Sequence, residues 1–316
     1  MTRILTITLN PAIDKSTSVP ALVPDRKLQC SNPVFEPGGG GVNVARAIIK
    51  LGGSATAVYL AGGHSGKFFD SLLHAEGIPA LPVPIAGNTR ENLILNDRGQ
   101  NMQYRLDMPG PVVDTYEWQH LLEVVRGIND IDYIVASGSL APGIPPDIFA
   151  TFSAIATIKG ARFIVDTSRE ALKQALYEGA YLIKPNLHEL SGLAGVDNLS
   201  TEEIIELAKE LIVKKRSEVV VVSLGKTGAI LITADISLKI PAPHVNSIST
   251  VGAGDSMLAG IVYSLAAGQE LIPAVQFGVA CGSAATLNPG TALCKKEDAQ
   301  SLFEEIAKTQ SLSTSC

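Results

Sequence analysis

The sequence is poor in aromatic residues and has no cluster of basic ones. Aromatics make up 5% of the 316 residues, and 25 Lys and Arg face 31 Asp and Glu, for a net charge of −6. A chain without a basic patch suits neither nucleic acid nor an anionic membrane, so we expect neither as a partner. An anionic small molecule is still allowed, because a pocket can be basic on an acidic protein.

Long hydrophobic runs and paired cysteines are also missing. No run of 18 apolar residues occurs, which predicts no membrane-spanning helix, and the N-terminal MTRILTITLN is too short for a signal peptide and lacks a cleavage site. Cys30, Cys281, Cys294 and Cys316 show no CxxC spacing. This predicts free thiols in a reducing compartment, with no metal site built from them. We therefore expect a cytoplasmic protein.

What the sequence does contain is a regular alternation of short β-like runs and helical patterns. The helical pattern is clearest at 202–215, where apolar residues recur every three or four positions. Candidate strands are the aliphatic runs at 4–9, 55–61, 133–137, 162–166, 181–184, 218–223 and 228–233. The alternation predicts an α/β fold over 1–316, with a mostly parallel sheet covered by helices on both faces.

Two segments break this alternation. Residues 11–36 hold several prolines and no helical period, and residues 88–107 read as two strands joined by a turn near Arg98–Gly99. Ligands of open α/β sheets bind at the carboxyl ends of the strands. We therefore expect the two segments to form a small sheet above a pocket at that edge.

The stretch STVGAGDSM (249–257) places a carboxylate directly after a glycine loop, where a helix is predicted to start. Unpaired N–H groups at a helix start suit an anion, such as the phosphates of a nucleotide, and glycines allow close approach. Asp255 beside such a site could accept a proton from a hydroxyl, as phosphoryl transfer to an alcohol requires. The alternative is that Asp255 only caps the helix.

Two further motifs strengthen the first interpretation. In EPGGGGVNVARAI, four glycines at 38–41 precede Asn43, which we expect to open a helix, and their entropic cost favours backbone held against a ligand over a flexible loop. In KPNLHE, Asn186 and Glu189 share one face of a helical turn. Such a pair can hold a hydrated Mg²⁺ beside phosphates, although a capped helix start is equally open.

Three other motifs suggest functions that the sequence does not support. LGKTG (224–228) is not a phosphate-binding P-loop, since the required glycine at position 220 is Val, and neither glycine cluster spells GxGxxG. A serine hydrolase with Ser256 as nucleophile is disfavoured because the α/β-hydrolase order places the catalytic histidine after the serine, and all five histidines here precede Ser256.

The motifs GGGGVNVARAI, KPNLHE and STVGAGDSM, in this order, resemble the signatures of the PfkB (ribokinase-like) carbohydrate kinase family, and the resemblance covers essentially the whole chain. SGSLAPG, VVVSLG and SAATLNPGT are similar to the minor-phosphofructokinase branch of that family. The resemblance implies a three-layer sandwich with a β lid at 11–36 and 88–110, and a homodimer through paired lids. It also implies ATP-dependent phosphorylation of fructose 6-phosphate at its 1-hydroxyl.

The resemblance assigns roles to individual residues. Asp255 would be the base, and the N–H groups of Gly252, Ala253 and Gly254 would stabilise the transferring phosphoryl group. The sugar hydroxyls would meet Asp14, Gly39, Gly40, Asn43 and Ser139, and the sugar phosphate would meet Lys27 and Arg90. ATP would lie along Lys184, Asn186, Ser223, Gly225, Gly228, Ser247, Val279 and Ser283.

The resemblance also implies two kinds of metal ion. Asn186 and Glu189 would position Mg²⁺ through water. K⁺ would be held, mostly by carbonyl oxygens, at Ser249, Val251, Ala285, Asn288 and Gly290. Ala292 stands where the family pattern has an arginine, so any side-chain role at that position is lost.

Other substrates stay open within the resemblance. Tagatose 6-phosphate and fructose 1-phosphate are the rivals, and TLNPAID (8–14) looks more like kinases of those sugars. Gly40 favours fructose 6-phosphate, because those relatives have a lysine at this position. A nucleotide-binding regulator without catalysis is a more remote alternative, against which Asp255 and Glu189 both count.

Overall fold

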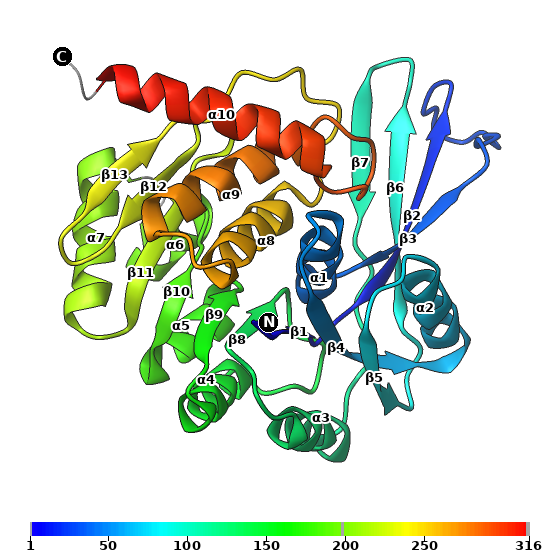
Figure 1. The fold of residues 1–316 in the computed structure, drawn as a ribbon. Helices are drawn as coiled ribbons and strands as arrows, with labels where there is room; N and C mark the ends of the chain where they lie inside the picture. The colour runs from blue at the N-terminus through cyan, green and yellow to red at the C-terminus, as the bar shows by residue number, and fades with distance from the viewer. Residues whose placement is uncertain (1, 197–198, 314–316) are drawn as a thin grey trace.

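The computed structural model describes residues 2–196 and 199–313 and arranges them around two sheets (Figure 1). The large sheet has nine strands in the order β13-β12-β11-β10-β9-β8-β1-β4-β5. These are β1 (Ile4–Thr8), β4 (Ala55–Gly62), β5 (Ala80–Ile85), β8 (Tyr133–Ser137), β9 (Arg162–Asp166), β10 (Ala180–Ile183), β11 (Ser217–Ser223), β12 (Ala229–Ile232) and β13 (Ser237–Ile240). Neighbours from β11 to β5 are parallel, and β12 and β13 join antiparallel.

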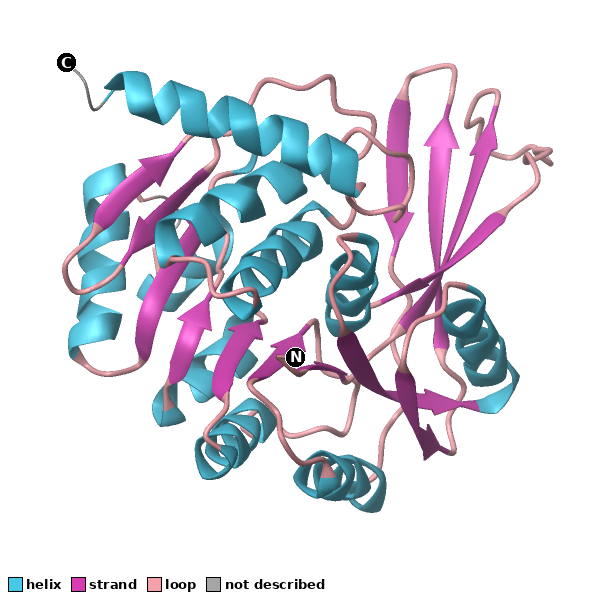
Figure 2. Ribbon diagram, viewed as in Figure 1, coloured by secondary structure: helices cyan, strands magenta, loops and turns pink. Residues whose placement is uncertain are grey.

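Helices cover both faces of this sheet, as Figure 2 shows. One face packs against α1 (Gly40–Lys50), α2 (Gly63–Ala75), α8 (Ala253–Ala266), α9 (Leu271–Ala285) and α10 (Lys296–Ser313). The other packs against α3 (Thr115–Gly127), α4 (Ile148–Lys159), α5 (Arg169–Glu178), α6 (Leu187–Ala194) and α7 (Thr201–Val213). The predicted α/β architecture with a mostly parallel sheet is confirmed.

The predicted strands all form, within two residues of their expected bounds, because each is an aliphatic run that the sheet buries. The sequence interpretation missed β5 and β13. Both lie at the edges of the sheet. Pro82 and Pro84 interrupt the β-like pattern of β5, and proline is tolerated in strands mainly at such edges. A short turn of 3-10 helix, η1 (Gly225–Thr227), lies between β11 and β12.

The two irregular segments form a second sheet in the order β3-β2-β6-β7, which confirms the predicted small sheet. Its strands are β2 (Ala12–Val19), β3 (Val34–Gly38), β6 (Arg90–Asp97) and β7 (Met102–Leu106). The β6–β7 turn falls where expected, and Asp97 accepts hydrogen bonds from the N–H groups of Leu22, Gly99 and Gln100. These three hydrogen bonds hold the pKa of Asp97 below its usual value, and the bond from Leu22 has the largest effect.

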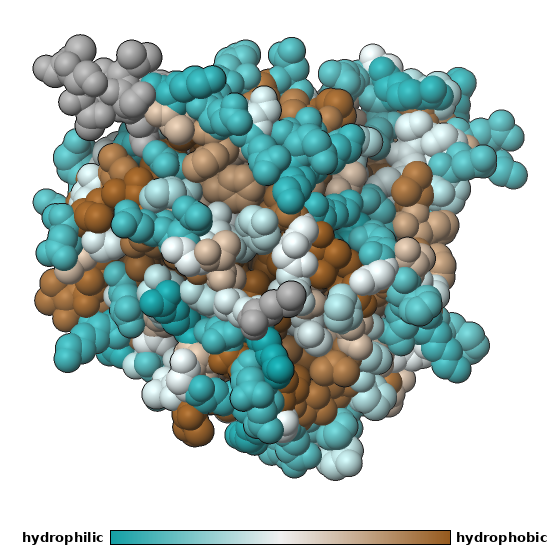
Figure 3. Space-filling view, viewed as in Figure 1, coloured by the Kyte–Doolittle hydropathy of each residue, from teal (hydrophilic) through white to brown (hydrophobic). Residues whose placement is uncertain are grey.

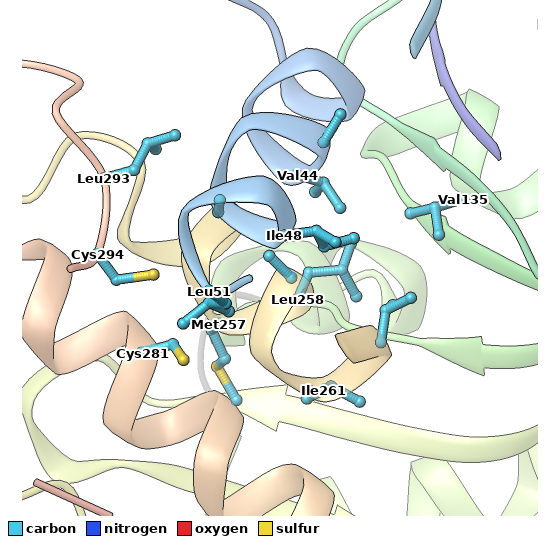
Figure 4. Packing of buried hydrophobic residues seen from close by; sticks show 14 of the residues in the cluster. Val44, Ile48, Leu51, Val135, Met257, Leu258, Ile261, Cys281, Leu293 and Cys294 are labelled. Atoms are coloured by element: carbon cyan, nitrogen blue, oxygen red, sulfur yellow. The ribbon is translucent and has the colours of Figure 1, made fainter. Parts of the chain in front are cut away.

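The starts of α1 and α8 lie close together because the two helices share one core. Val44, Ile48 and Leu51 of α1 pack in the same buried cluster as Met257 and Leu258 of α8 (Figure 4). This contact joins the two glycine motifs in space.

Helix α1 begins at Gly40 and not at Asn43, so the expected start was three residues late. A Cβ on Gly40 would lie 2.3 Å from Ser137 Oγ, and one on Gly41 would lie 2.4 Å from the Ile7 carbonyl oxygen. Without side chains, the first turn of the helix can lie directly against β1 and β8. The glycines are therefore needed for packing within the protein as well as for any ligand.

Two smaller expectations concern membranes and thiols. No helix in the described residues is long and apolar enough to cross a membrane. Cys30, Cys281 and Cys294 are free thiols, as predicted. The prediction for Cys316 lies outside the described residues.

We predict that Leu258→Ala lowers the free energy of unfolding by about 2–5 kcal/mol, because it leaves a cavity between α1 and α8. Leu258 is fully buried in this cluster. Urea unfolding followed by circular dichroism measures the change. Ile158→Ala is the control, since Ile158 on α4 is 86% exposed, and its effect should stay within about 0.5 kcal/mol. Equal effects of the two changes would contradict this view of the core.

Candidate active site

The first turn of α8 carries Asp255, and its partner comes from the other glycine motif. Asn43 Nδ2 donates a hydrogen bond to Asp255 Oδ2 at 2.9 Å. The N-cap of α8 is Gly252, with φ of 72°, and no side chain caps this helix. Asp255 is therefore not the helix cap that the sequence left open, and its carboxylate faces α1.

The surroundings of Asp255 make its carboxylate a stronger base than usual. The pKa of Asp255 is raised to about 6, and burial is the largest cause. The hydrogen bond from Asn43 and the charge of Lys184 act in the opposite direction, while the charge of Asp166 raises the pKa further. At neutral pH the group is then ionised, yet its proton affinity is close to the optimum for a general base.

Lys184 places a positive charge at the start of α8. It follows β10, and its Nζ lies 3.1 Å from Asp166 Oδ2 at the end of β9. Burial lowers the pKa of Lys184, but the neighbouring Asp166 carboxylate outweighs burial and the pKa lies above its usual value. A Cβ on Gly254 would lie 3.4 Å from Lys184 Nζ. The ammonium group and the N–H groups of the helix start together form a site for an anion.

Asp166 was missed by the sequence interpretation, although a signal existed. It is the last residue of the predicted strand at 162–166, and Lys184 is the last residue of the next predicted strand at 181–184. Parallel neighbours end at the same edge of a sheet. An acid and a lysine at those two positions are therefore expected to meet.

Asp14 is a second carboxylate with a raised pKa. The pKa of Asp14 is raised to about 6, and burial is the largest cause. The hydrogen bond from Asn92 opposes this rise, and the charge of Glu36 adds to it. Asn92 Nδ2 donates to Asp14 Oδ1 at 3.0 Å. A Cβ on Gly38 would lie 2.2 Å from Asp14 Oδ2, so the glycine motif packs against this carboxylate. Asn92 is a further residue that the sequence did not single out.

Arg90 and Ser139 meet through Asn10. Arg90 Nη2 donates to the Asn10 carbonyl oxygen and Nη1 to that of Met108, both at 3.0 Å. Asn10 Nδ2 lies 3.2 Å from Ser139 Oγ. The Nε of Arg90 is buried without a hydrogen-bond partner in the described structure. Lys27 is exposed in the loop after β2, and no described contact places it beside Arg90.

Asn186 and Glu189 form a capping box at the start of α6. The Glu189 N–H donates to Asn186 Oδ1 at 2.8 Å, and the Asn186 N–H donates to Glu189 Oε2 at 2.9 Å. Burial raises the pKa of Glu189, and the Asn186 hydrogen bond lowers it. The capped helix start is thus real, and it fixes the two side chains next to each other.

These two oxygen-bearing side chains fit a hydrated Mg²⁺. Within residues 2–196 and 199–313, no group of three or more His, Cys, Asp or Glu could hold a metal ion directly. Mg²⁺ commonly keeps several waters and takes its remaining ligands from one or two carboxylates and substrate phosphates. Asn186 and Glu189 match that pattern.

A cavity of about 470 Å³ adjoins Asn186 and the end of β11. Of the predicted nucleotide residues, Asn186, Ser223 and Gly225 line it. The Ser223 N–H donates to the Pro185 carbonyl oxygen at 2.9 Å, which ties the two sides of the cavity together. The remaining predicted residues lie outside its lining, and these are Lys184, Gly228, Ser247, Val279 and Ser283.

The residues predicted for K⁺ lie on the loop before α8 and on the end of α9 with the loop that follows it, and these two segments contact each other. The Ile248 N–H donates to the Thr286 carbonyl oxygen at 2.7 Å, and Ser249 Oγ donates to that of Gly290 at 3.4 Å. Val251 N–H donates to Ser249 Oγ, and Asn288 Nδ2 donates to the Leu293 carbonyl oxygen. The site offers carbonyl and hydroxyl oxygens, the ligands that hard cations prefer. The structure brings Ser249, Val251 and Gly290 together, and Ala285 lies one residue before Thr286.

Comparison of the sequence with known proteins identifies the family. The model of the pfkB family carbohydrate kinases matches residues 4–298. The chain belongs to this family. The pfkB-family chain is 43% identical to the ATP-dependent 6-phosphofructokinase isozyme 2 of Escherichia coli, over 98% of this chain and all of that protein. It is 30% identical to the 1-phosphofructokinase of Borreliella burgdorferi, over 96% and 97% of the two chains.

Solved structures agree with this membership of the pfkB family. The phosphofructokinase-2 of Escherichia coli in complex with potassium matches with a TM-score of 0.93, and its complex with fructose-6-phosphate with 0.91. Each covers 97% of this chain and all of the other, at 43% and 42% identity. A tetrameric inhibited form of the same enzyme matches with a TM-score of 0.92, at 42% identity and with the same coverage of both chains. The predicted family and fold are confirmed.

We predict that Asp255→Asn stabilises this pfkB-family protein at pH 8. The pKa of about 6 in the folded protein lies above the ordinary 3.8. Ionisation therefore costs stability as pH rises through this window, and the cost is complete above about pH 6. The variant lacks that cost, so its free energy of unfolding should exceed the wild-type value by about 3 kcal/mol.

Urea unfolding at pH 8 and pH 5 measures this gain, which should be smaller at pH 5. Asp235→Asn is the control, because Asp235 is exposed in the β12–β13 turn. A gain that does not depend on pH would show that Asp255 is not held with a raised pKa.

Proposed function

We propose that this chain is an ATP-dependent kinase that phosphorylates fructose 6-phosphate at its 1-hydroxyl and yields fructose 1,6-bisphosphate, the 6-phosphofructokinase step of glycolysis. The proposal rests above all on the contact of Asn43 with Asp255 at 2.9 Å. It places a base with a raised pKa at a helix N-terminus, next to the Lys184 ammonium. A base beside an anion site is what phosphoryl transfer to an alcohol requires.

The chemistry follows from this arrangement. The sugar 1-hydroxyl gives its proton to Asp255 while its oxygen forms a bond to the γ-phosphorus of ATP. The bond from that phosphorus to the bridging oxygen breaks, and ADP leaves. The N–H groups of Gly252, Ala253 and Gly254, with Lys184, stabilise the negative charge on the transferring group.

The proposal includes two metal ions. Asn186 and Glu189 would hold hydrated Mg²⁺, which when bound neutralises charge on the phosphates. Carbonyl and hydroxyl oxygens at Ser249, Val251, Ala285, Asn288 and Gly290 would hold K⁺ near the start of α8. The potassium complex of the Escherichia coli enzyme supports the second assignment.

The acceptor is proposed from the substrate side of the site. Asp14, Asn43, Ser139 and the backbone of Gly39 and Gly40 would bind the sugar hydroxyls. Arg90 has an unused buried Nε donor, and a guanidinium suits a phosphate dianion. Lys27 would join it from the β2–β3 loop. The fructose-6-phosphate complex of the Escherichia coli enzyme supports this choice.

Two sugar phosphates remain as alternative substrates. The 30% identity to a 1-phosphofructokinase favours fructose 1-phosphate, and the TLNPAID motif favours fructose 1-phosphate or tagatose 6-phosphate. Gly40 and the higher identity to 6-phosphofructokinases favour fructose 6-phosphate.

We predict that fructose 6-phosphate has the highest kcat/KM in a coupled ADP-release assay with ATP, Mg²⁺ and K⁺. Tagatose 6-phosphate and fructose 1-phosphate are tested beside it. Preference for either rival by about tenfold would overturn the assignment. Asp255→Asn should lower kcat by about a hundredfold or more, because the general base is lost. Asp235→Asn makes the same chemical change on the surface and should leave kcat intact.

A homodimer through a lid formed by 11–36 and 88–110 is also proposed. The outer strands of the small sheet, β3 and β7, expose Val34, Met102 and Leu106. Hydrophobic surface gathers beside this sheet, on the right of the molecule (Figure 3). Strand edges of this kind are covered in many proteins by a partner. The cytoplasmic location stays a prediction.

We predict a dimeric mass by light scattering at micromolar concentration. Val34→Asp should shift the mass toward that of the monomer, because it places a charge on the proposed interface. Ile158→Asp on α4 is the matched control and should leave the mass unchanged. A monomeric wild-type protein would exclude this interface.

A further inference from the structure

Arg46 is the bulkiest fully buried side chain described, only 1% exposed in the second turn of α1. A buried guanidinium is costly unless its N–H groups find acceptors. Glu76 takes two of them, with Nε to Oε2 at 2.8 Å and Nη2 to Oε1 at 2.6 Å. Sequence reasoning did not single out Arg46, although it lies within the first glycine motif.

The third nitrogen of Arg46, Nη1, shares its two hydrogens among three acceptors that come from three separate segments. It donates to the carbonyl oxygen of Pro37 at 2.8 Å, to Asn43 Oδ1 at 3.2 Å and to the carbonyl oxygen of Thr291 at 3.3 Å. Pro37 belongs to β3 of the small sheet, and Thr291 belongs to the loop after α9. Glu36, the residue before Pro37, also links these two segments, because its carboxylate accepts a hydrogen bond from the Thr291 N–H at 3.0 Å.

The contact with Asn43 has a directional consequence. A side-chain amide has one acceptor end and one donor end. Because Arg46 occupies the oxygen of Asn43, the amide nitrogen must face the opposite way, where Asp255 Oδ2 accepts from it. If the amide turned over, its oxygen would face the Asp255 carboxylate and its NH₂ group would face the guanidinium. Both contacts would then be repulsive.

We propose that Arg46 is a positioning residue that acts through Asn43. Its guanidinium fixes the orientation of the Asn43 amide, so that the amide donates to Asp255, and ties this contact to β3 and to the loop at Thr291. The assignment of a catalytic effect rests on the proposed function, in which Asp255 is the base. The orientation of the amide does not depend on that function.

The test is Arg46→Lys, which keeps the charge near Glu76 but loses the planar fork that reaches several acceptors at once. We expect kcat to fall by about tenfold while the KM for ATP changes less than about twofold. Arg162→Lys is the matched control. Arg162 stacks on Tyr133 and Tyr181 at the amino end of β9, far from Asp166 along the strand. It should leave kcat unchanged.

A double-mutant cycle decides whether Arg46 acts through Asn43. In an Asn43→Ala background, Arg46→Lys should change kcat by less than about twofold, because the amide it orients is gone. The same tenfold loss in both backgrounds, or no loss in the single variant, would overturn the proposal. If Arg46→Lys does not fold, the pair Arg46→Met and Glu76→Met replaces it in the cycle, since it leaves no unpaired Glu76.

A measurement without substrate separates this inference from the proposed function. The side-chain amide resonances of Asn43 in ¹⁵N NMR should shift with pH in the wild type, following the ionisation of Asp255. Asp166, Lys184 and Asp14 also influence Asp255, and they lie on other elements. In Arg46→Lys, with the fold verified, the shift should be lost. An identical titration in both proteins would refute the orienting role, whatever the enzyme phosphorylates.

Discussion

One hydrogen bond, from Asn43 to Asp255, joins residues that are 212 positions apart in the chain. It can form only because α1 and α8 pack side by side on the same face of the large sheet, with Ile48 and Leu258 in their common core. The glycines at the start of α1 let that helix sit directly against β1 and β8. The position of the proposed base therefore depends on packing between one helix from the first third of the chain and one from the last third.

The site is assembled from charges that water no longer fully solvates. Asp14, Glu189 and Asp255 all have pKa values raised by burial, and Lys184 is held as a cation mainly by Asp166, with smaller contributions from Asp255 and Glu189. Each of these groups reduces stability relative to a neutral residue at neutral pH or requires a dedicated partner. The protein retains these charged groups at the place where, in the proposed reaction, a proton and a phosphoryl group would move. Apolar side chains there would be more stable but could not take part in that chemistry.

The sequence predicted those features whose cause is local. Aliphatic runs predicted β1, β4 and β8 to β12, and the glycine motifs identified Asn43 and Asp255. The edge strand β5 was missed because Pro82 and Pro84 obscure its pattern. Local sequence could not decide whether Asp255 caps a helix, since the deciding partner lies on α1. Arg46, Asn92 and Asp166 were missed for the same reason, because each matters through a residue on another element. Lys27 remains a prediction, since it is exposed in the β2–β3 loop.

The parallel pairing of β2 with β6 joins two strands that are far apart in the sequence. Asp14 and its partner Asn92 are 78 residues apart, and α1, β4, α2 and β5 lie between the two strands. The β2–β3 pair is local in the sequence, whereas β6 follows β4 and β5 of the large sheet in the chain and pairs with β2 over a long separation. Contacts of such long sequence separation form slowly. The pocket around Asp14 is thus expected to mature late, and a chain interrupted before β6 would keep that acid without its amide partner.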